Sequence, residues 1–158
     1  MAELMDLGYS SDRPENIRQL LFVSVDLLPQ VWPQVKPLFL ERPEQWEELF
    51  TIESIAFLLG KGKMQLWTLN DENEFLLALI TELIPFPKTT LLNLLFLVGS
   101  ELRDGLEFLD CIEMWAKKHG ATKSVARGNA AMFRLLRPHG YAEERSVFGK
   151  DISRMREH

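Results

Sequence analysis

One carboxylate stands inside an otherwise apolar stretch of the sequence. Residues 75–84 have the sequence FLLALITELI, and Glu82 is their only charged side chain. Burial would make this carboxylate a stronger base, and a general base needs that property to accept a proton from a reacting group. The alternative is that Glu82 lies at the open end of a strand and faces water. Both interpretations of Glu82 stay open at the level of the sequence.

The other reactive residue types form no recognisable catalytic or metal-binding pattern. The three histidines, His119, His139 and His158, fall at helix ends or in the tail, and Cys111 is the only cysteine. This spacing fits no metal-ligand motif, and a single cysteine forms no internal disulfide. The sequence also lacks a Gly-x-Ser-x-Gly elbow, a Gly-Lys-Ser/Thr phosphate loop and a His-Glu-x-x-His helix. We therefore expect no bound metal.

Charge and hydropathy narrow the classes of partner. The formal net charge of −5 argues against nucleic acid, which needs a basic surface. The longest apolar stretches, 75–84 and 91–98, are far shorter than the roughly 20 residues of a membrane helix. We expect a cytoplasmic protein that does not enter a membrane and that binds another protein. Trp32 and Trp46 are the best candidates for interface anchors, with core packing as the alternative.

Periodicity predicts one α/β domain. A polar leader over 1–16, expected to be mobile, precedes a domain over 17–152, and a charged tail over 153–158 is expected to fray. The apolar spacing predicts strands at 18–27, 64–69, 75–84, 89–98, 122–127 and 141–152, and helices at 28–40, 51–60, 101–119 and 129–137. Because 75–84 and 89–98 are apolar on both faces, we expect a sheet covered by helices on both sides.

This order of elements resembles the GNAT (N-acetyltransferase-like) superfamily over about residues 18–152. Residues 115–120 (WAKKHG) resemble the family's xxAxxxG helix end, and the segment from Asn129 to Gly140-Tyr141 resembles its Asn…Gly-Phe segment. The pieces 31–33, 65–67 and 97–99 are similar to a divergent group often encoded by tailed bacteriophages. The resemblance implies a central mixed, mostly antiparallel sheet of about six strands flanked by about four helices.

The resemblance also implies where acetyl-CoA would bind. In the family, the pattern Gln/Arg-x-x-Gly-x-Gly/Ala holds the pyrophosphate between the fourth strand and the long helix, where backbone amides point at the phosphates. The matching stretch here is 98–105 (VGSELRDG), in which the glycines are six apart and Glu101 and Asp104 set two carboxylates against Arg103. We therefore expect no bound cofactor, or acetyl-CoA if the chain is an enzyme. The cofactor-contacting positions would then be Val98, Gly99, Ser100, Arg103 and Asn129.

Catalytic residues carried over from the family are sparse. A tyrosine often precedes the Gly-Phe-like pair by four residues and protonates the leaving thiolate, but Leu136 stands there. Tyr141 occupies the Phe-like position, where a packed ring is the alternative to an acid, and Asn129 is also a good helix N-cap. Glu82 is the candidate for the base that the family often places on its meander.

Two functions are considered on the basis of this resemblance. The first is a GNAT-fold protein without acetyltransferase activity that acts as a protein-interaction or virion-associated module, encoded by a phage and located in the host cytoplasm or the virion. The second is a divergent acetyl-CoA-dependent N-acetyltransferase. The closing region supplies one strand where the family has two, which predicts an exposed sheet edge open to another chain, including a second copy of this one.

Overall fold

The computed structural model describes residues 4–10, 18–72, 74–128, 130–144 and 149–156. The chain divides into two compact units, residues 1–127 and 128–158. All six strands of the sheet lie in the first unit, and the single domain over 17–152 stays a prediction.

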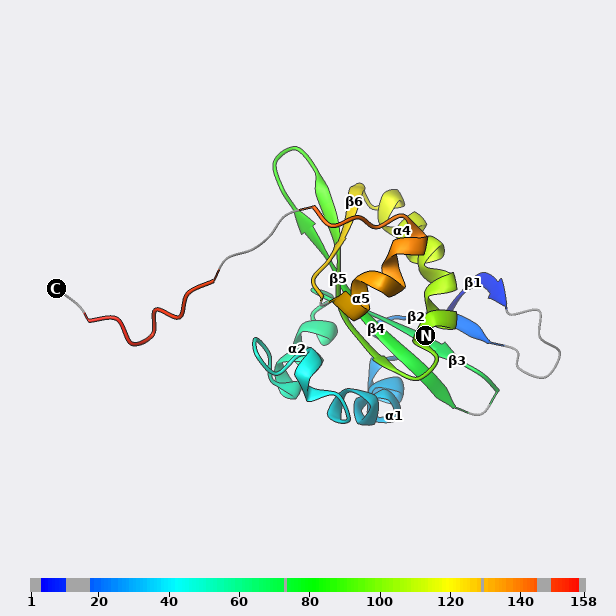
Figure 1. The fold of residues 1–158 in the computed structure, drawn as a ribbon. Helices are drawn as coiled ribbons and strands as arrows, with labels where there is room; N and C mark the ends of the chain where they lie inside the picture. Colours follow the sequence, from blue (N-terminus) through cyan, green and yellow to red (C-terminus); the bar gives the residue numbers. More distant parts are fainter. Residues whose placement is uncertain (1–3, 11–17, 73, 129, 145–148, 157–158) are drawn as a thin grey trace. The chain divides into compact units, whose positions relative to one another are not determined.

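The first unit is built on a six-stranded sheet in which the strands lie in the order of the sequence (Figure 1). The strands are β1 (Leu4–Ser10), β2 (Gln19–Val23), β3 (Gln65–Asn70), β4 (Phe75–Pro85), β5 (Thr90–Gly99) and β6 (Ala121–Ala126). All neighbours pair antiparallel except β5 and β6, which are parallel and therefore need a crossover connection. A mixed, mostly antiparallel sheet flanked by helices confirms the fold class expected from the sequence.

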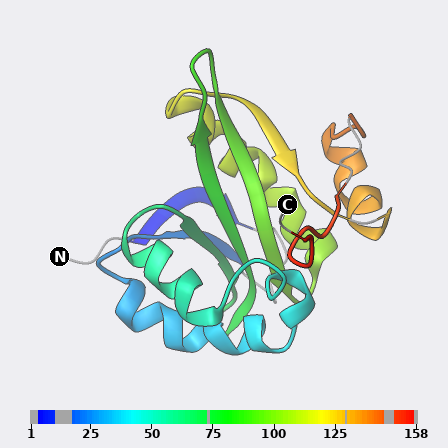
Figure 2. The same ribbon diagram turned by 90° about the vertical axis from the view of Figure 1, so that its left-hand side faces the viewer.

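The helices cover both faces of this sheet. Between β2 and β3 the chain forms α1 (Leu28–Leu40), a 3-10 turn η1 (Pro43–Gln45) and α2 (Ile52–Gly60); between β5 and β6 it forms α3 (Leu102–Gly105), a 3-10 turn η2 (Leu106–Phe108) and α4 (Leu109–Lys118). Figure 2 shows α1 and α2 on one face of the sheet and α4 on the other. The second unit contains α5 (Ala130–Leu136) and a 3-10 turn η3 (Arg137–His139). Within the described residues, no helix is long and apolar enough to span a bilayer.

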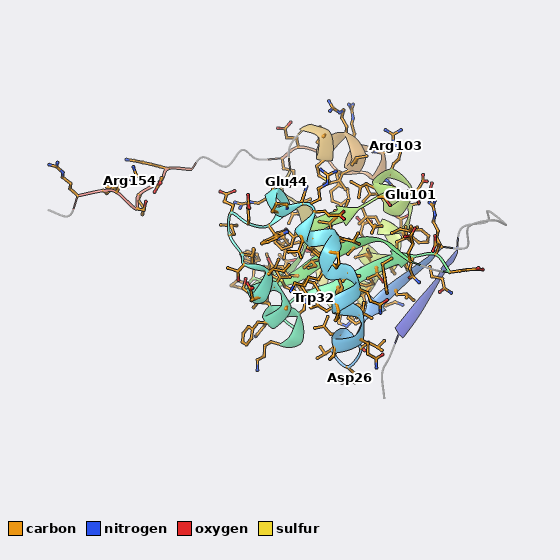
Figure 3. The ribbon with its side chains drawn as sticks, turned by 90° about the horizontal axis from the view of Figure 1, so that it is seen from below. Asp26, Trp32, Glu44, Glu101, Arg103 and Arg154 are labelled. Atoms are coloured by element: carbon orange, nitrogen blue, oxygen red, sulfur yellow. The ribbon has the colours of Figure 1, made fainter. Side chains whose placement is uncertain are left out.

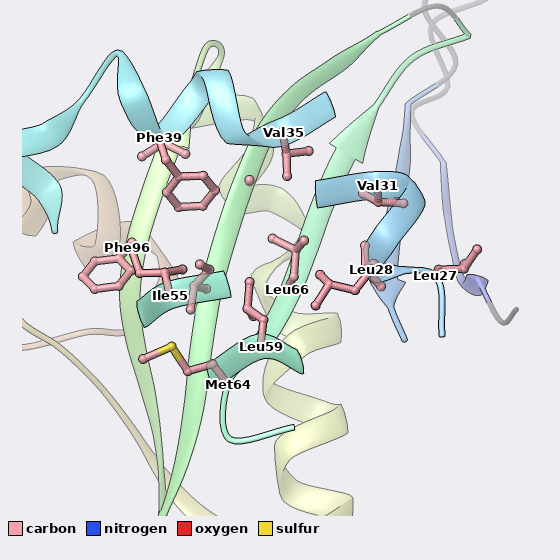
Figure 4. Packing of buried hydrophobic residues seen from close by; sticks show 14 residues of the cluster. Leu27, Leu28, Val31, Val35, Phe39, Ile55, Leu59, Met64, Leu66 and Phe96 are labelled. Atoms are coloured by element: carbon pink, nitrogen blue, oxygen red, sulfur yellow. The ribbon is translucent and has the colours of Figure 1, made fainter. Parts of the chain in front are cut away.

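Two apolar layers hold the sheet in place. On one face Val35, Phe39 and Ile55 are completely buried in a cluster with strand residues such as Leu66 and Phe96 (Figure 4). On the other face, strand side chains and the helix-forming crossover enclose an apolar cavity of about 20 Å³, enough for one water at most. Its lining residues are Leu20, Trp67, Leu69, Leu77, Leu79, Leu97, Gly105, Leu106, Leu109 and Ile112. The cavity is too small and too apolar to hold a substrate, so we interpret it as a small packing defect in the core.

The N-terminal leader contains a strand that the sequence analysis did not predict. β1 pairs with β2 from Leu4↔Val23 to Ser10↔Gln19, with a register irregularity after Asp6. Strand pairing uses backbone N–H and C=O groups that every residue except proline carries, so it needs no alternation of side chains. The absence of a period in this segment was therefore a poor guide to its structure.

The last strand predicted from the sequence, over 141–152, is not found in the described residues. Of the segment 141–152, residues 141–144 and 149–152 contain no strand, and residues 145–148 lie outside the described part of the chain. The Asp151 carboxylate accepts hydrogen bonds from the Ser153 backbone N–H at 2.9 Å and from its hydroxyl at 2.6 Å. Local side-chain bonds of this kind compete with extended backbone.

The N-terminus of α2 provides a test of local stability. The Thr51 hydroxyl accepts from the Ser54 backbone N–H at 3.0 Å, and the Ser54 hydroxyl accepts from the Thr51 N–H at 2.9 Å. Thr51→Ala removes the first of these bonds and is expected to lower the free energy of unfolding by about 1 kcal/mol. Urea unfolding followed by circular dichroism measures the change, and Thr51→Ser should keep most of the stability. Equal unfolding midpoints for Thr51→Ala and the wild type would contradict this assignment.

Candidate functional site

The turn after β5 is shaped by its contact with β4. Gly99 has φ +114°, and a Cβ at this position would lie 2.3 Å from the Leu76 carbonyl oxygen. The next residue, Ser100, donates its backbone N–H to that same oxygen at 2.8 Å, and its hydroxyl lies 3.3 Å from it. Glycine is therefore required here for close approach of two backbones. The Ser100 amide, one of those expected to face a cofactor phosphate, is bonded within the protein.

An ion cluster fixes the residues that follow. The Arg18 guanidinium lies 2.5 Å from the Glu101 carboxylate and 3.1 Å from that of Asp104. The Arg18 side chain is only 6% exposed, whereas the two acidic side chains are 40% and 39% exposed. Arg18 directly precedes β2 and reaches across to a turn that begins more than eighty positions later in the chain. Figure 3 shows Glu101 together with Arg103 on this turn.

This cluster changes the charge balance that the sequence predicted. Two carboxylates, Glu101 and Asp104, were expected to oppose the single guanidinium of Arg103, which is exposed. Arg18 adds a second guanidinium, so the formal charges of the four groups sum to zero. The repulsion of an anion is weaker than expected, yet the buried Arg18 is already occupied by two carboxylates. Sequence reasoning missed Arg18 because nothing near it in the chain marks its partners.

The helix that begins at this turn is also divided. One helix was expected over 101–119, but the chain forms the four-residue α3, the 3-10 turn η2 and then α4. Glu101 itself adopts a left-handed conformation with φ 58° and ψ 38°, which is uncommon for a residue with a side chain. The predicted end of the helix is confirmed, because α4 ends at Lys118 and Gly120 follows with φ +94°.

Beside this turn, β5 has an edge that β6 leaves open. The two strands pair only from Thr90↔Ala121 to Leu94↔Ala126. Beyond Leu94, no strand in the described part of the chain pairs with this edge of β5, and Figure 2 shows β6 diverging from it. A bulge marks the change, because Thr81 pairs with Leu94 while Ile80 pairs with Phe96, which leaves Leu95 as the extra residue.

The hydrogen-bond pattern shows which groups face the open edge. The bond from the Ser100 N–H to the Leu76 oxygen makes Leu77↔Gly99 a pair of the non-hydrogen-bonded kind. In an antiparallel ladder the two kinds of pair alternate, so Val98 exchanges bonds with β4 while Leu97 and Gly99 direct their N–H and C=O groups away from it. The open edge of β5 therefore presents the backbone groups of Leu97 and Gly99.

The candidate base lies away from this turn. Glu82 is half-buried on β4 opposite Asn93, whose side-chain amide donates to the Glu82 carboxylate at 3.0 Å. Asn93 is six residues before Gly99 on β5, a separation of about 20 Å along an extended strand. Glu82 is half-exposed and hydrogen-bonded, so it is neither a deeply buried base nor a fully solvated carboxylate.

The remaining predicted positions are placed as follows. Val98 is buried in the core beneath α1 and α2, so only its backbone borders the turn. Tyr141 is half-buried in the second unit, and Asn129 lies outside the described residues. Of the predicted cofactor positions, the structure brings together Val98, Gly99, Ser100 and Arg103 at the end of β5. Among the described residues, no three His, Cys, Asp or Glu side chains gather closely enough to hold a metal ion.

Comparison with known proteins gives matches at the level of structure. No family model and no curated protein matches this sequence. An aminoglycoside acetyltransferase from an uncultured soil metagenomic sample, solved with sisomicin, superposes with a TM-score of 0.67 at 16% identity, over 85% of this chain and 95% of that one. A predicted acetyltransferase from Clostridium acetobutylicum, solved with acetyl-CoA, gives 0.62 at 10% identity, over 85% and 96%.

A third match points the same way. An aminoglycoside N-acetyltransferase in complex with CoA gives a TM-score of 0.64 at 8% identity, over 89% of this chain and 98% of that chain. Identities this low describe a shared architecture and carry no information on activity. Together with the sheet order, the parallel β5–β6 pair and the two helical layers, they show that this chain has the GNAT fold of these acetyltransferases.

Proposed function

We propose that this chain is a GNAT-fold protein that does not transfer acetyl groups and acts by binding another protein, as a virion-associated or host-directed module of a bacteriophage. The observation that carries the proposal is the Arg18–Glu101–Asp104 cluster at the turn after β5. The buried guanidinium already has two anions of its own, and the turn has no net positive charge. A pyrophosphate would have to displace internal carboxylates to be bound there.

Two further features support the loss of acetyl transfer. The Ser100 amide is bonded to Leu76, so it is not directed at a ligand phosphate. Leu136, at the position where the family often has its tyrosine acid, is buried and has no proton to donate. A protein with neither a phosphate-binding loop nor this tyrosine acid lacks two features on which acetyl transfer from CoA depends in the family.

Exposed apolar side chains in the segment from α1 to α2 support the proposal of a protein partner. Trp32 and Trp46, the anchors considered from the sequence, pack on their own core instead: the Trp46 indole N–H donates to the Phe39 carbonyl at 2.8 Å, and the Trp32 ring lies 5.5 Å from that of Phe39. Leu49 and Phe57 are exposed instead, at 71% and 61%. Contiguous exposed apolar side chains mark interaction surfaces, so we propose Leu49, in the turn before α2, and Phe57, on α2, as candidate contacts with the partner.

A divergent acetyltransferase remains the second candidate, and one observation favours it. The backbone groups of Leu97 and Gly99 at the open edge of β5 offer hydrogen bonds to any extended ligand that contains amides, and acetyl-CoA contains such an arm. The matched structures with CoA and acetyl-CoA make this the natural rival proposal.

A thermal-shift titration separates the two candidates. A ligand that binds only the folded state at 100 times its dissociation constant stabilises it by about 2.7 kcal/mol. We expect millimolar CoA to leave the melting temperature unchanged, and acetyl-CoA with sisomicin to give no acetylated product. Titration with inorganic pyrophosphate tests the turn alone. A saturable rise in melting temperature with micromolar CoA would overturn the proposal in favour of the enzyme.

A further inference from the structure

The hairpin that joins β4 to β5 projects beyond the rest of the sheet. The last pair between β3 and β4 is Gln65↔Thr81, whereas β4 and β5 stay paired as far as Pro85↔Thr90. The part of β4 after Thr81 therefore lies past the end of β3, and Figure 1 shows this hairpin extending away from that strand. We call its end, residues 85–88 (PFPK), the fingertip.

Backbone bonds fix the conformation of the fingertip. The Phe86 N–H donates to the Thr89 carbonyl at 2.7 Å, and the Thr89 N–H donates to the Phe86 carbonyl at 3.3 Å. Pro87 is the first central residue of the turn that these bonds close, a position that suits its fixed φ. The Thr89 hydroxyl is also hydrogen-bonded to that of Thr122 on β6. Because the fingertip is held in place before a partner binds, binding costs little conformational entropy there.

The fingertip exposes apolar surface to water. Pro85, Phe86 and Pro87 follow one another and are all exposed, with Phe86 53% exposed. Behind them the cross-strand pair Ile84↔Leu91 is half-buried. A single exposed apolar residue is ordinary, but three in succession on a fixed turn are unusual unless they serve a function. The function that an exposed aromatic ring on a rigid turn serves best is that of an interface anchor.

The shape and the charge of the fingertip define its partner. A projecting aromatic ring loses most contact with water when it enters a pocket. Lys88 is exposed beside Phe86 and is the only charged residue in 83–100. Among the described residues no carboxylate forms an ion pair with Lys88. A pocket that covers Phe86 would bring Lys88 to its rim, where an Asp or Glu side chain complements it.

The apolar cavity of this protein does not provide such a pocket in a second copy. Its volume of about 20 Å³ admits one water at most and is too small for a phenyl ring. The occupant that fits the fingertip is therefore a different protein, one with an apolar pocket rimmed by a carboxylate.

We propose that the fingertip inserts Phe86 into an apolar pocket of the protein partner, with Lys88 paired to a carboxylate at the rim of that pocket. This inference rests on the proposed function, because it specifies how the partner is held. The contact lies on a different part of the chain from Leu49 and Phe57, so the two surfaces can be tested separately.

Photocrosslinking of the full chain tests the contact and locates the pocket. The photoreactive residue p-benzoylphenylalanine replaces Phe86 or, as a matched control, Met114 on α4, which is also 53% exposed. In extracts of the cells that produce the protein, we expect the label at 86 to give one crosslinked protein, attached through a peptide with apolar residues and Asp or Glu, and the label at 114 to give none. Excess unlabelled wild-type chain should suppress this product at least about tenfold, and excess Phe86→Ser chain should not.

Affinity measurements with the crosslinked protein then separate the ring from the charge. Phe86→Ser should weaken binding at least about thirtyfold, as expected of an interface hot spot. Lys88→Glu should also weaken binding, and its effect should shrink at high salt because the charge at the rim is screened. Met114→Ser should leave the affinity within about twofold. Since Phe86 is exposed, Phe86→Ser should shift the melting temperature by no more than about 2 °C, so that lost binding does not reflect unfolding.

The outcomes distinguish this inference from the proposed function. Equal suppression by the wild-type and Phe86→Ser chains, a crosslink from position 86 only to a second copy, or crosslinks from labels at Leu49 or Phe57 with none at 86 would overturn the fingertip contact and leave a protein partner elsewhere on the surface. No crosslinked protein from any of these positions would overturn both. Sedimentation with phosphatidylglycerol vesicles that is lost in Phe86→Ser would overturn the inference as well, because the ring would then serve a membrane contact.

Discussion

Gly99→Ala is expected to destabilise the protein by about 3–5 kcal/mol, or to prevent it from folding. The added Cβ would lie 2.3 Å from the Leu76 carbonyl oxygen and 2.6 Å from the Leu77 Cα, and both are backbone atoms that no rotamer change can move. The backbone angle of φ +114° adds strain for any residue with a side chain. Because Ser100 bonds to the same carbonyl, relief of the clash would also disturb the turn that holds Glu101 and Asp104.

The measurement is urea unfolding, with Gly62→Ala as the matched control. Gly62 also has positive φ, at +70°, but a Cβ there would meet nothing within 4 Å. The control should therefore lose only the conformational part, about 1 kcal/mol. A similar loss of stability for both variants would show that the contact with β4 is not what makes Gly99 necessary.

Arg18→Met is expected to lower the free energy of unfolding by about 2–3 kcal/mol. The substitution keeps an unbranched apolar stem in the buried position and removes the guanidinium that contacts Glu101 and Asp104. The loss should be smaller than for a fully buried ion pair, because the two carboxylates are about two-fifths exposed and can be hydrated.

Two controls separate the ion pairs from the loss of side-chain volume. Arg42 pairs with Glu44 at 3.4 Å, and more than half of each side chain is exposed, so Arg42→Met should change the stability by no more than about 0.5 kcal/mol. The triple variant Arg18→Met, Glu101→Gln, Asp104→Asn should recover part of the loss, because no charge is then left without its partner. Equal midpoints for Arg18→Met and the wild type would mean that the cluster contributes nothing to stability.

The sequence predicted the elements whose own residues determine them. The apolar runs of β4 and β5, the amphipathic stripe with Leu109, Ile112 and Ala116, and Gly120 after α4 all appear where local patterns indicate. Each of these depends on burial of nearby side chains or on the conformational freedom of one glycine. These local patterns were sufficient to predict the fold class.

The parts that the sequence did not predict depend on distant or backbone contacts. Arg18 and Asp104 are 86 positions apart, and no spacing in a single sequence links them. β1 forms through main-chain bonds to β2 that have no side-chain signature. The described residues of the strand expected over 141–152 contain no strand, and only its end shows a competing local interaction, the bonds from Ser153 to the Asp151 carboxylate. The candidate cofactor positions Val98, Gly99, Ser100 and Arg103 stay a prediction, and the charge balance of the turn they form could be described only from the tertiary structure.

The sheet order also bears on how the protein folds during synthesis. Because every strand lies beside its predecessor in the chain, each emerging strand finds its neighbour already made, and no earlier pair has to open to admit it. Five strands need only antiparallel contacts, and the slow step of forming a parallel pair falls to the last one, β6. During synthesis from the N-terminus, the antiparallel strands β1–β5 can therefore pair first. The crossover and β6, which complete the sheet, follow at the end.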